Sequence, residues 1–144
     1  AMNSPTSISP GITPARNILK EADGLQCVWS GRPVTAGSMH IDHAIPFSLR
    51  HDNSLWNLFP TDKRVNSSKR DNLPAYSLLQ RQKELIIGYW KLFHANEQTL
   101  FENESNRFLG TKSFPRQWEG QMFSTFVESI EYTASRRGIA RWEV

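Results

Sequence analysis

The spacing of apolar residues in the second half of the chain constrains the fold more than any other feature. Over residues 75–96 and again over residues 114–137, apolar side chains recur every three or four positions. This period places them on one face of a helix. The recurring residues are Leu78, Leu79, Leu85, Ile86, Tyr89, Trp90 and Phe93, and then Trp118, Met122, Phe123, Phe126, Ile130 and Thr133. We therefore expect two long amphipathic helices whose aromatic residues pack a core.

The first half of the chain contains the segments that favour strands. Short apolar stretches are closed there by Gly, Pro and polar residues, which is typical of strands and turns. The expected elements are a helix over 14–22, a strand or hairpin at 25–30, a strand over 39–46, a polar loop over 48–54, a short strand at 58–60, and a helix over 63–70 capped by Thr61 or Asp62. A further short helix is expected at 103–109. The pattern predicts an α+β fold.

The domain organisation follows from length and local composition. A chain of 144 residues suits one domain. Residues 1–14 are rich in Ser, Pro and Thr and carry no charge, so we interpret them as a flexible linker or tag remnant, with Ala1 before Met2 as a cloning scar. Residues 15–144 then form the domain, with a core at 25–74 and a helical extension at 75–144. No apolar run is long enough to span a membrane.

Charge and cysteine content exclude several classes of protein. The chain has 17 basic and 14 acidic residues, a net charge of +3 that permits a nucleic-acid partner without requiring one. The single cysteine, Cys27, excludes an intramolecular disulfide framework and a zinc site built from several cysteines of this chain.

Residues with catalytic potential gather between positions 40 and 72. Asp42 and His43 stand together near the end of an expected strand. Asn57 follows, and Asn66 comes one helical turn before Lys69. Each has an ordinary explanation: an Asp–His pair often only shares a hydrogen bond, a loop asparagine often closes a turn, and a basic helix face is usually solvated.

Together these residues suit the hydrolysis of a phosphodiester. That reaction needs a base, a divalent cation, and positive charge near the phosphate. His43 suits the base because imidazole titrates near neutral pH. Asp42 and Asn66 offer the oxygen ligands that magnesium prefers. Adjacent strand residues point to opposite faces, so Asp42 and His43 need a bend near Pro46 to serve one site.

Residues 25–74 resemble the HNH endonuclease family, whose ββα-metal or His-Me finger fold is a hairpin and a helix around one metal. The motif is most similar to the HNH domains of CRISPR RNA-guided nucleases and of bacterial restriction and defence proteins. The residues that carry the resemblance are Asp42-His43-x-x-Pro46, Asn57, Asn66-x-x-Lys69 and Asp71-Asn72-Leu73-Pro74.

The resemblance implies a role for each motif position. His43 would be the general base, and Asp42 and Asn66 would be the metal ligands. Asn57 would brace the loop between the strands, and Lys69 would contact phosphate or support the site. Further phosphate contacts are expected from Lys63, Arg64 and Arg70, while His40 could help to bind metal or phosphate.

The resemblance also bears on cofactors. Many relatives have His where Asn66 stands, and an amide oxygen favours Mg or Mn. Many also hold a structural zinc with two Cys-x-x-Cys pairs, but here Cys27 is the one thiol, with Ser30, Asp62 and Val65 at the other places. We therefore predict no structural zinc and a buried Cys27. His51 is expected to be solvated and His94 structural.

The predicted function is that of a metal-dependent endonuclease acting on DNA, expected to be double-stranded, in a restriction or defence protein of the bacterial cytoplasm, bacterial or phage-derived. One alternative is a non-catalytic nucleic-acid-binding module. A second is a secreted HNH toxin, which we rank lower because residues 75–144 follow the motif. Those residues could also form a homodimer or dock a sensor domain, linked or separate.

Overall fold

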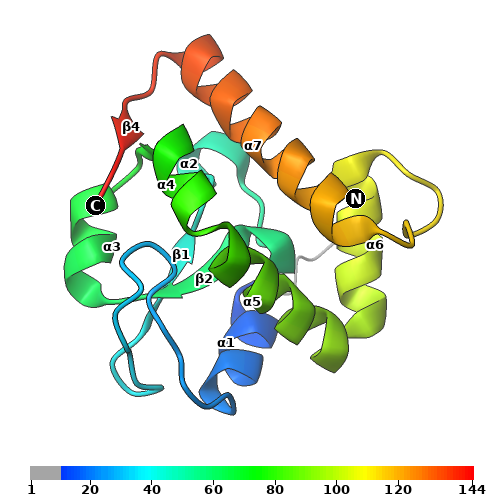
Figure 1. Ribbon diagram of the computed structural model, residues 1–144, viewed down its shortest axis with the longest axis horizontal. Coiled ribbons are helices and arrows are strands. Elements are labelled where there is room, and N and C mark those ends of the chain that lie inside the picture. The colour runs from blue at the N-terminus through cyan, green and yellow to red at the C-terminus, as the bar shows by residue number, and fades with distance from the viewer. Residues whose placement is uncertain (1–10) are drawn as a thin grey trace, which may run out of the picture.

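The computed structural model describes residues 11–144 and confirms an α+β fold with a helical C-terminal half (Figure 1). The linker expected at 1–14 lies outside the described residues as far as residue 10, and the first helix already begins at Thr13. The elements are α1 (Thr13–Lys20), β1 (His40–His43), α2 (Phe47–Arg50), the 3-10 helix η2 (Leu55–Asn57), β2 (Leu58–Thr61), α3 (Lys63–Lys69), β3 (Leu73–Pro74), α4 (Tyr76–Arg81), α5 (Lys83–Asn96), α6 (Gln98–Leu109), α7 (Trp118–Arg137) and β4 (Arg141–Trp142).

The expected hairpin and helix are present. β1 pairs antiparallel with β2, with His40 opposite Thr61 and His43 opposite Leu58. α3 follows β2 and packs against β1. Asp62 caps α3 because its Oδ1 accepts a hydrogen bond from the Val65 N–H at 2.8 Å, whereas Thr61 is the last residue of β2. The ββα arrangement is therefore formed by residues 40–69.

The strand expected at 25–30 is not formed. Only an isolated bridge joins Gln26 to Pro33. The backbone of this loop finds partners outside a sheet: the Val28 N–H donates to the Pro60 carbonyl at 2.9 Å. The Cys27 N–H also donates to the Arg32 carbonyl at 2.7 Å, and the Val34 N–H to the Leu25 carbonyl at 3.0 Å. Of the two expected alternatives, a strand or a hairpin, the segment therefore forms a tight antiparallel turn and no regular strand.

The expected polar loop at 48–54 is also partly helical. Phe47–Arg50 forms the single turn α2, which ends at His51 in the left-handed conformation with a φ of 54°. Residues 55–57 then form η2. A one-turn helix carries too few residues to show a period, so its sequence reads as a loop.

The helical half differs from expectation at three places. The helix expected over 75–96 is interrupted at Gln82, giving α4 and α5. The short helix expected at 103–109 is the end of the longer α6. β3 and β4 pair in parallel, Leu73 with Arg141, which joins the end of the motif to the end of the chain. Such a pairing between distant segments leaves no local signal in the sequence.

The core lies between the hairpin and the helices, with α5 at its centre. α5 contacts α1, α4, α6, α7 and η2. Trp90 is fully buried there, and its indole N–H donates to the Trp56 carbonyl at 2.9 Å. Phe126 of α7 meets the Trp90 ring edge-on at 5.3 Å. The prediction that the aromatic stripes pack a core is confirmed.

Membrane insertion has no support in the helices that the structure describes. Among residues 11–144, none combines the length and the apolar character that a crossing requires.

A buried carboxyl joins α6 to the loop that carries the motif. Glu104 is 5% exposed, and its Oε1 accepts a hydrogen bond from the Leu55 N–H at 2.8 Å. Burial raises the pKa of Glu104 from 4.5 to about 7, because the charged form loses its hydration. The start of η2 therefore depends on an acid that is partly protonated near neutral pH.

We predict that Glu104→Gln makes stability less dependent on pH. Because the folded-state pKa of about 7 lies above the ordinary 4.5, the folded protein binds a proton that the unfolded chain releases between these values. The contribution of Glu104 to stability is therefore lost as pH rises through this window, by on the order of 3 kcal/mol. Gln keeps an acceptor for Leu55 without the charge.

The measurement is urea unfolding of both proteins from mildly acidic to mildly alkaline pH. The free energy of unfolding of the variant, relative to that of the wild type, should increase as pH rises. A difference that stays constant across the range would contradict the assignment. The matched control is Glu128→Gln, at an exposed position of α7.

Candidate active site

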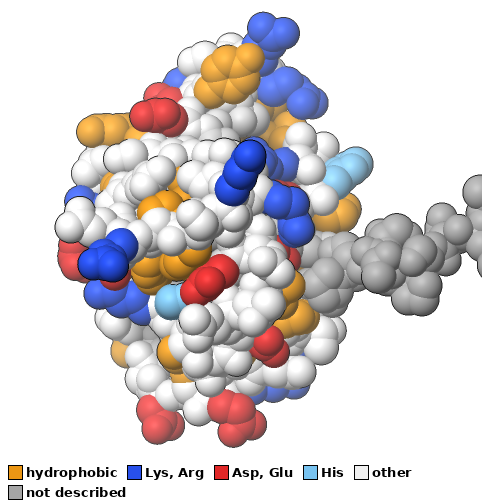
Figure 2. All heavy atoms as spheres, turned by 90° about the vertical axis from the view of Figure 1, so that its right-hand side faces the viewer, with side chains coloured by type: hydrophobic (Ala, Val, Ile, Leu, Met, Phe, Trp, Pro, Cys, Tyr) orange, Lys and Arg blue, Asp and Glu red, His pale blue; other side chains and the backbone are white. Residues whose placement is uncertain are grey.

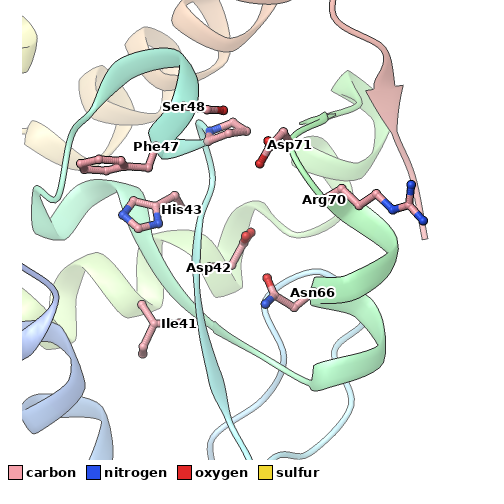
Figure 3. Close-up of a pocket in the computed structure, with 9 residues that line it drawn as sticks. Ile41, Asp42, His43, Phe47, Ser48, Asn66, Arg70 and Asp71 are labelled. Carbon is pink, nitrogen blue, oxygen red and sulfur yellow. The ribbon is translucent and has the colours of Figure 1, made fainter.

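An open pocket of about 310 Å³ lies where β1, α2 and α3 meet (Figure 3). Four residues predicted from the sequence line it: Asp42, His43, Asn66 and Arg70. Phe47, Ser48 and Asp71 line it as well. The pocket therefore brings together the predicted base and both predicted metal ligands.

Asp42 lies near the end of β1 and is almost fully buried. Its Oδ2 accepts a hydrogen bond from the Trp29 indole N–H at 2.8 Å and lies 3.3 Å from Lys69 Nζ. Both contacts use the same oxygen, which leaves Oδ1 for the pocket. Figure 3 shows Asp42 on the same side of the β1 trace as Asn66.

Lys69 is fully buried in the last turn of α3. Besides its ion pair with Asp42, its ammonium donates to the His43 carbonyl at 3.0 Å. Burial raises the pKa of Asp42 and lowers that of Lys69, because each charge loses hydration, and their mutual attraction opposes both shifts without cancelling them. Of the two roles expected for Lys69, this geometry fits support of the site.

His43 is half-buried at the end of β1, and the chain turns into α2 at Pro46. The Nε2 atom of His43 lies 2.7 Å from Asn53 Oδ1. An amide oxygen can only accept, so this bond places the ring hydrogen on Nε2 and leaves the lone pair on Nδ1. Figure 3 shows His43 and Asp42 on opposite sides of the β1 trace, although both line the pocket.

Asn53 was missed by the sequence analysis. It lies in the loop between α2 and η2, among other polar residues, and nothing in that local pattern distinguishes it. Only the fold of the loop brings its amide to the ring of His43.

Asn57 is fully buried and does not line the pocket. Its Oδ1 accepts from the Ile45 N–H at 2.8 Å, and its Nδ2 donates to the carbonyls of Ile45 and Asp52 at 3.0 Å each. These three bonds join the chain just after His43 to the loop that carries Asn53. The geometry fits the bracing role that the resemblance implies.

The remaining predicted residues divide into two groups. Asn66 lies on α3, and its amide oxygen is drawn toward Asp42 in Figure 3. Arg70 directly follows α3 and lines the pocket. Three exposed residues do not line it: His40 at the start of β1, and Lys63 and Arg64 at the start of α3.

The donor set suits a hard divalent cation. Asp42 supplies a carboxylate oxygen and Asn66 an amide oxygen, the kind of ligands that magnesium and manganese take. Within residues 11–144, no three His, Cys, Asp or Glu side chains gather into a metal site. Two protein ligands such as these, together with water and substrate oxygens, are sufficient for magnesium.

Cys27 and His94 lie outside the pocket. Cys27 is buried with a free thiol, as predicted. The Nε2 atom of His94 lies 2.8 Å from Glu102 Oε2, and its ring packs among Phe101, Phe114 and Trp118. That no structural zinc is bound stays a prediction.

We predict that Lys69→Met destabilises the fold by about 3–5 kcal/mol, since it leaves the Asp42 carboxylate buried without a counter-charge. Adding Asp42→Asn should recover part of this loss, because the amide can still accept from Trp29. Urea unfolding of both single variants and the double variant measures the coupling. If the loss of stability in the double variant equals the sum of the losses in the two single variants, the two charges do not stabilise each other.

The comparisons with known proteins agree with this geometry over the motif. No curated protein matches the chain. A family model described as HNH endonuclease matches residues 27–75, which include the β1–β2 hairpin, α3 and the pocket. Members of this family are generally nucleases that act on nucleic acid. The segment 27–75 is thus similar to HNH endonucleases, and the family resemblance predicted from its residues is confirmed over this segment.

Proposed function

We propose that the protein is a metal-dependent endonuclease that hydrolyses phosphodiester bonds of DNA in the pocket. The observation that carries the proposal is the meeting of Asp42, His43 and Asn66 at one open pocket. The match of residues 27–75 to HNH endonucleases supports the same chemistry.

Asp42 and Asn66 would hold one divalent cation, magnesium or manganese. When bound, it would offset charge on the phosphate and on the leaving oxygen. Lys69 keeps the Asp42 carboxylate in place through the ion pair and stays out of the pocket. Arg70 adds positive charge at the pocket wall, where a phosphate would lie.

His43 would act as the general base through Nδ1. It removes a proton from a water molecule, whose oxygen then forms a bond to phosphorus as the bond from phosphorus to the 3′ oxygen breaks. The leaving oxygen takes a proton from solvent, so the products carry a 5′-phosphate and a 3′-hydroxyl. Asn53 holds the imidazole in the required tautomer.

The wider role rests on the resemblance. We infer a restriction or defence protein of the bacterial cytoplasm, in which the nuclease domain expected at 15–144 begins with α1 at Thr13. One such site cuts one strand, so cleavage of double-stranded DNA needs a homodimer or two successive nicks. A sensor domain, linked or separate, would select the target.

The first test is cleavage of a supercoiled plasmid by wild type and His43→Ala with magnesium, manganese or EDTA. We expect nicking with either metal, none with EDTA, and a rate at least about 100-fold lower in the variant, because the base is removed. Intact plasmid in every lane, together with binding of DNA, would favour the non-catalytic module instead. Cutting that survives His43→Ala would show that the base is assigned wrongly.

A second test addresses Asn53. In Asn53→Ala the ring of His43 loses the bond that sets its tautomer, and we expect a turnover about 10- to 100-fold lower, as for other groups that orient a functional histidine. The affinity for DNA should not change, because Asn53 does not line the pocket. Asn53→Asp keeps an acceptor oxygen and should restore most of the turnover. Equal activity in all three proteins would exclude a positioning role.

A further inference from the structure

A second groove lies beside the pocket, between α2 and α7. It has a volume of about 320 Å³. Ile45 and Leu49 contribute its apolar side chains, and Arg50, Tyr132, Arg136 and Arg137 contribute its long polar ones. We refer to it as the α2–α7 groove. None of its residues is one of the proposed metal ligands, and four of them, Tyr132, Thr133, Arg136 and Arg137, come from the last turns of α7.

The α2–α7 groove is positively charged. Three arginines line it, and no acidic residue does. Within residues 11–144, neither Arg136 nor Arg137 has an ion-pair partner, so their charges are available to a ligand. Figure 2 shows several Lys and Arg side chains near the top of the face that it draws, at the height where α7 ends in Figure 1. A favourable interaction with the helix dipole explains why arginines are tolerated there, but it does not explain a groove without acids.

Arg50 is held in place by two aromatic rings, an ion pair and a hydrogen bond. Its guanidinium lies 5.1 Å from the ring of Trp56 and 5.3 Å from that of Phe108. It also pairs with Asp52 at 3.2 Å and reaches Ser129 of α7 at 3.4 Å. The ion pair offsets part of the charge of Arg50. The net positive charge of the groove therefore comes chiefly from α7.

Exposed aromatic rings accompany these charges. Tyr132 lines the α2–α7 groove with 66% of its surface exposed, and Phe47 lines the active-site pocket with 44% exposed. Phe47 stacks on His51 with ring centres 4.9 Å apart. Arginines interspersed with exposed aromatic rings are typical of surfaces that bind nucleic acid.

The groove and the pocket are neighbours along the chain. Ile45 lines the groove, while Pro46 and Phe47, the next two residues, line the pocket. A strand whose phosphate lies at His43 would therefore reach the groove by crossing α2. Its next phosphates would then meet the arginines that α7 contributes to the groove.

We infer that the α2–α7 groove binds the sugar–phosphate backbone of the DNA that is cut in the pocket, on one side of the scissile phosphate. This inference rests on the proposed function and adds a second contact surface outside the HNH motif. Arg136 and Arg137 would each neutralise a phosphate. The helical extension is then part of the substrate-binding surface as well as of the core.

The test is the affinity for a short fluorescent DNA duplex, measured by anisotropy at several salt concentrations in the presence of magnesium. All variants carry His43→Ala, because this substitution prevents cleavage of the duplex. Arg136→Gln with Arg137→Gln removes two charges from the groove. Lys112→Gln with Arg116→Gln removes two charges from exposed positions in the α6–α7 loop and is the matched control. Arg136→Lys with Arg137→Lys keeps the charge. Circular dichroism melting checks that each variant folds.

We expect the groove variant to bind about 10-fold more weakly, with a salt dependence reduced by about two counterions, while the control changes little and the lysine pair stays near the parent. Unchanged affinity and salt dependence, or an equal loss in the control, would overturn the inference. If plasmid is still cut by the wild type in that case, the proposed nuclease stands and only the groove is wrong. If the parent binds no DNA and the wild type does not cut, both proposals fail.

Discussion

The site depends on the buried ion pair between Asp42 and Lys69. It joins β1 to α3, and Lys69 also binds the carbonyl of His43, so one ammonium contacts both Asp42 and His43 of the strand. Trp29 and Lys69 share one carboxylate oxygen, which leaves the other for the pocket. Two opposite charges in a dry interior are tolerated only together. The interaction that stabilises the hairpin against the helix therefore also orients the carboxylate proposed to hold the cation.

The helical half supports the motif from outside. Tyr89 of α5 bonds both backbone groups of Gln26, and Glu104 of α6 holds the start of η2. Trp29, which orients Asp42, lies 5.9 Å from the ring of Phe59 in the same core. These contacts join the segment 27–75 to the helices through a shared hydrophobic core and a few buried hydrogen bonds.

The part of the site that could be predicted from the sequence is the set of residues in the motif. Asp42, His43 and Asn66 were expected to meet, and the structure places all three at one pocket. Lys63 and Arg64 were expected to contact phosphate with Arg70, yet only Arg70 lines the pocket. On a helix as short as α3, the direction in which each side chain points depends on how the helix packs against β1. The amino-acid composition of the helix does not determine this packing.

The sequence by itself determined the α+β class and the amphipathic helices, because each is encoded by spacing over a few residues. The hairpin with its following helix was implied by the resemblance of the motif to the HNH family. The tertiary structure alone decided the contacts between distant segments. These include the pairing of β3 with β4, the bond from Asn53 to His43, and the groove between α2 and α7. Their residues have ordinary neighbours along the chain. They acquire a role only because burial of the apolar faces brings separate elements together.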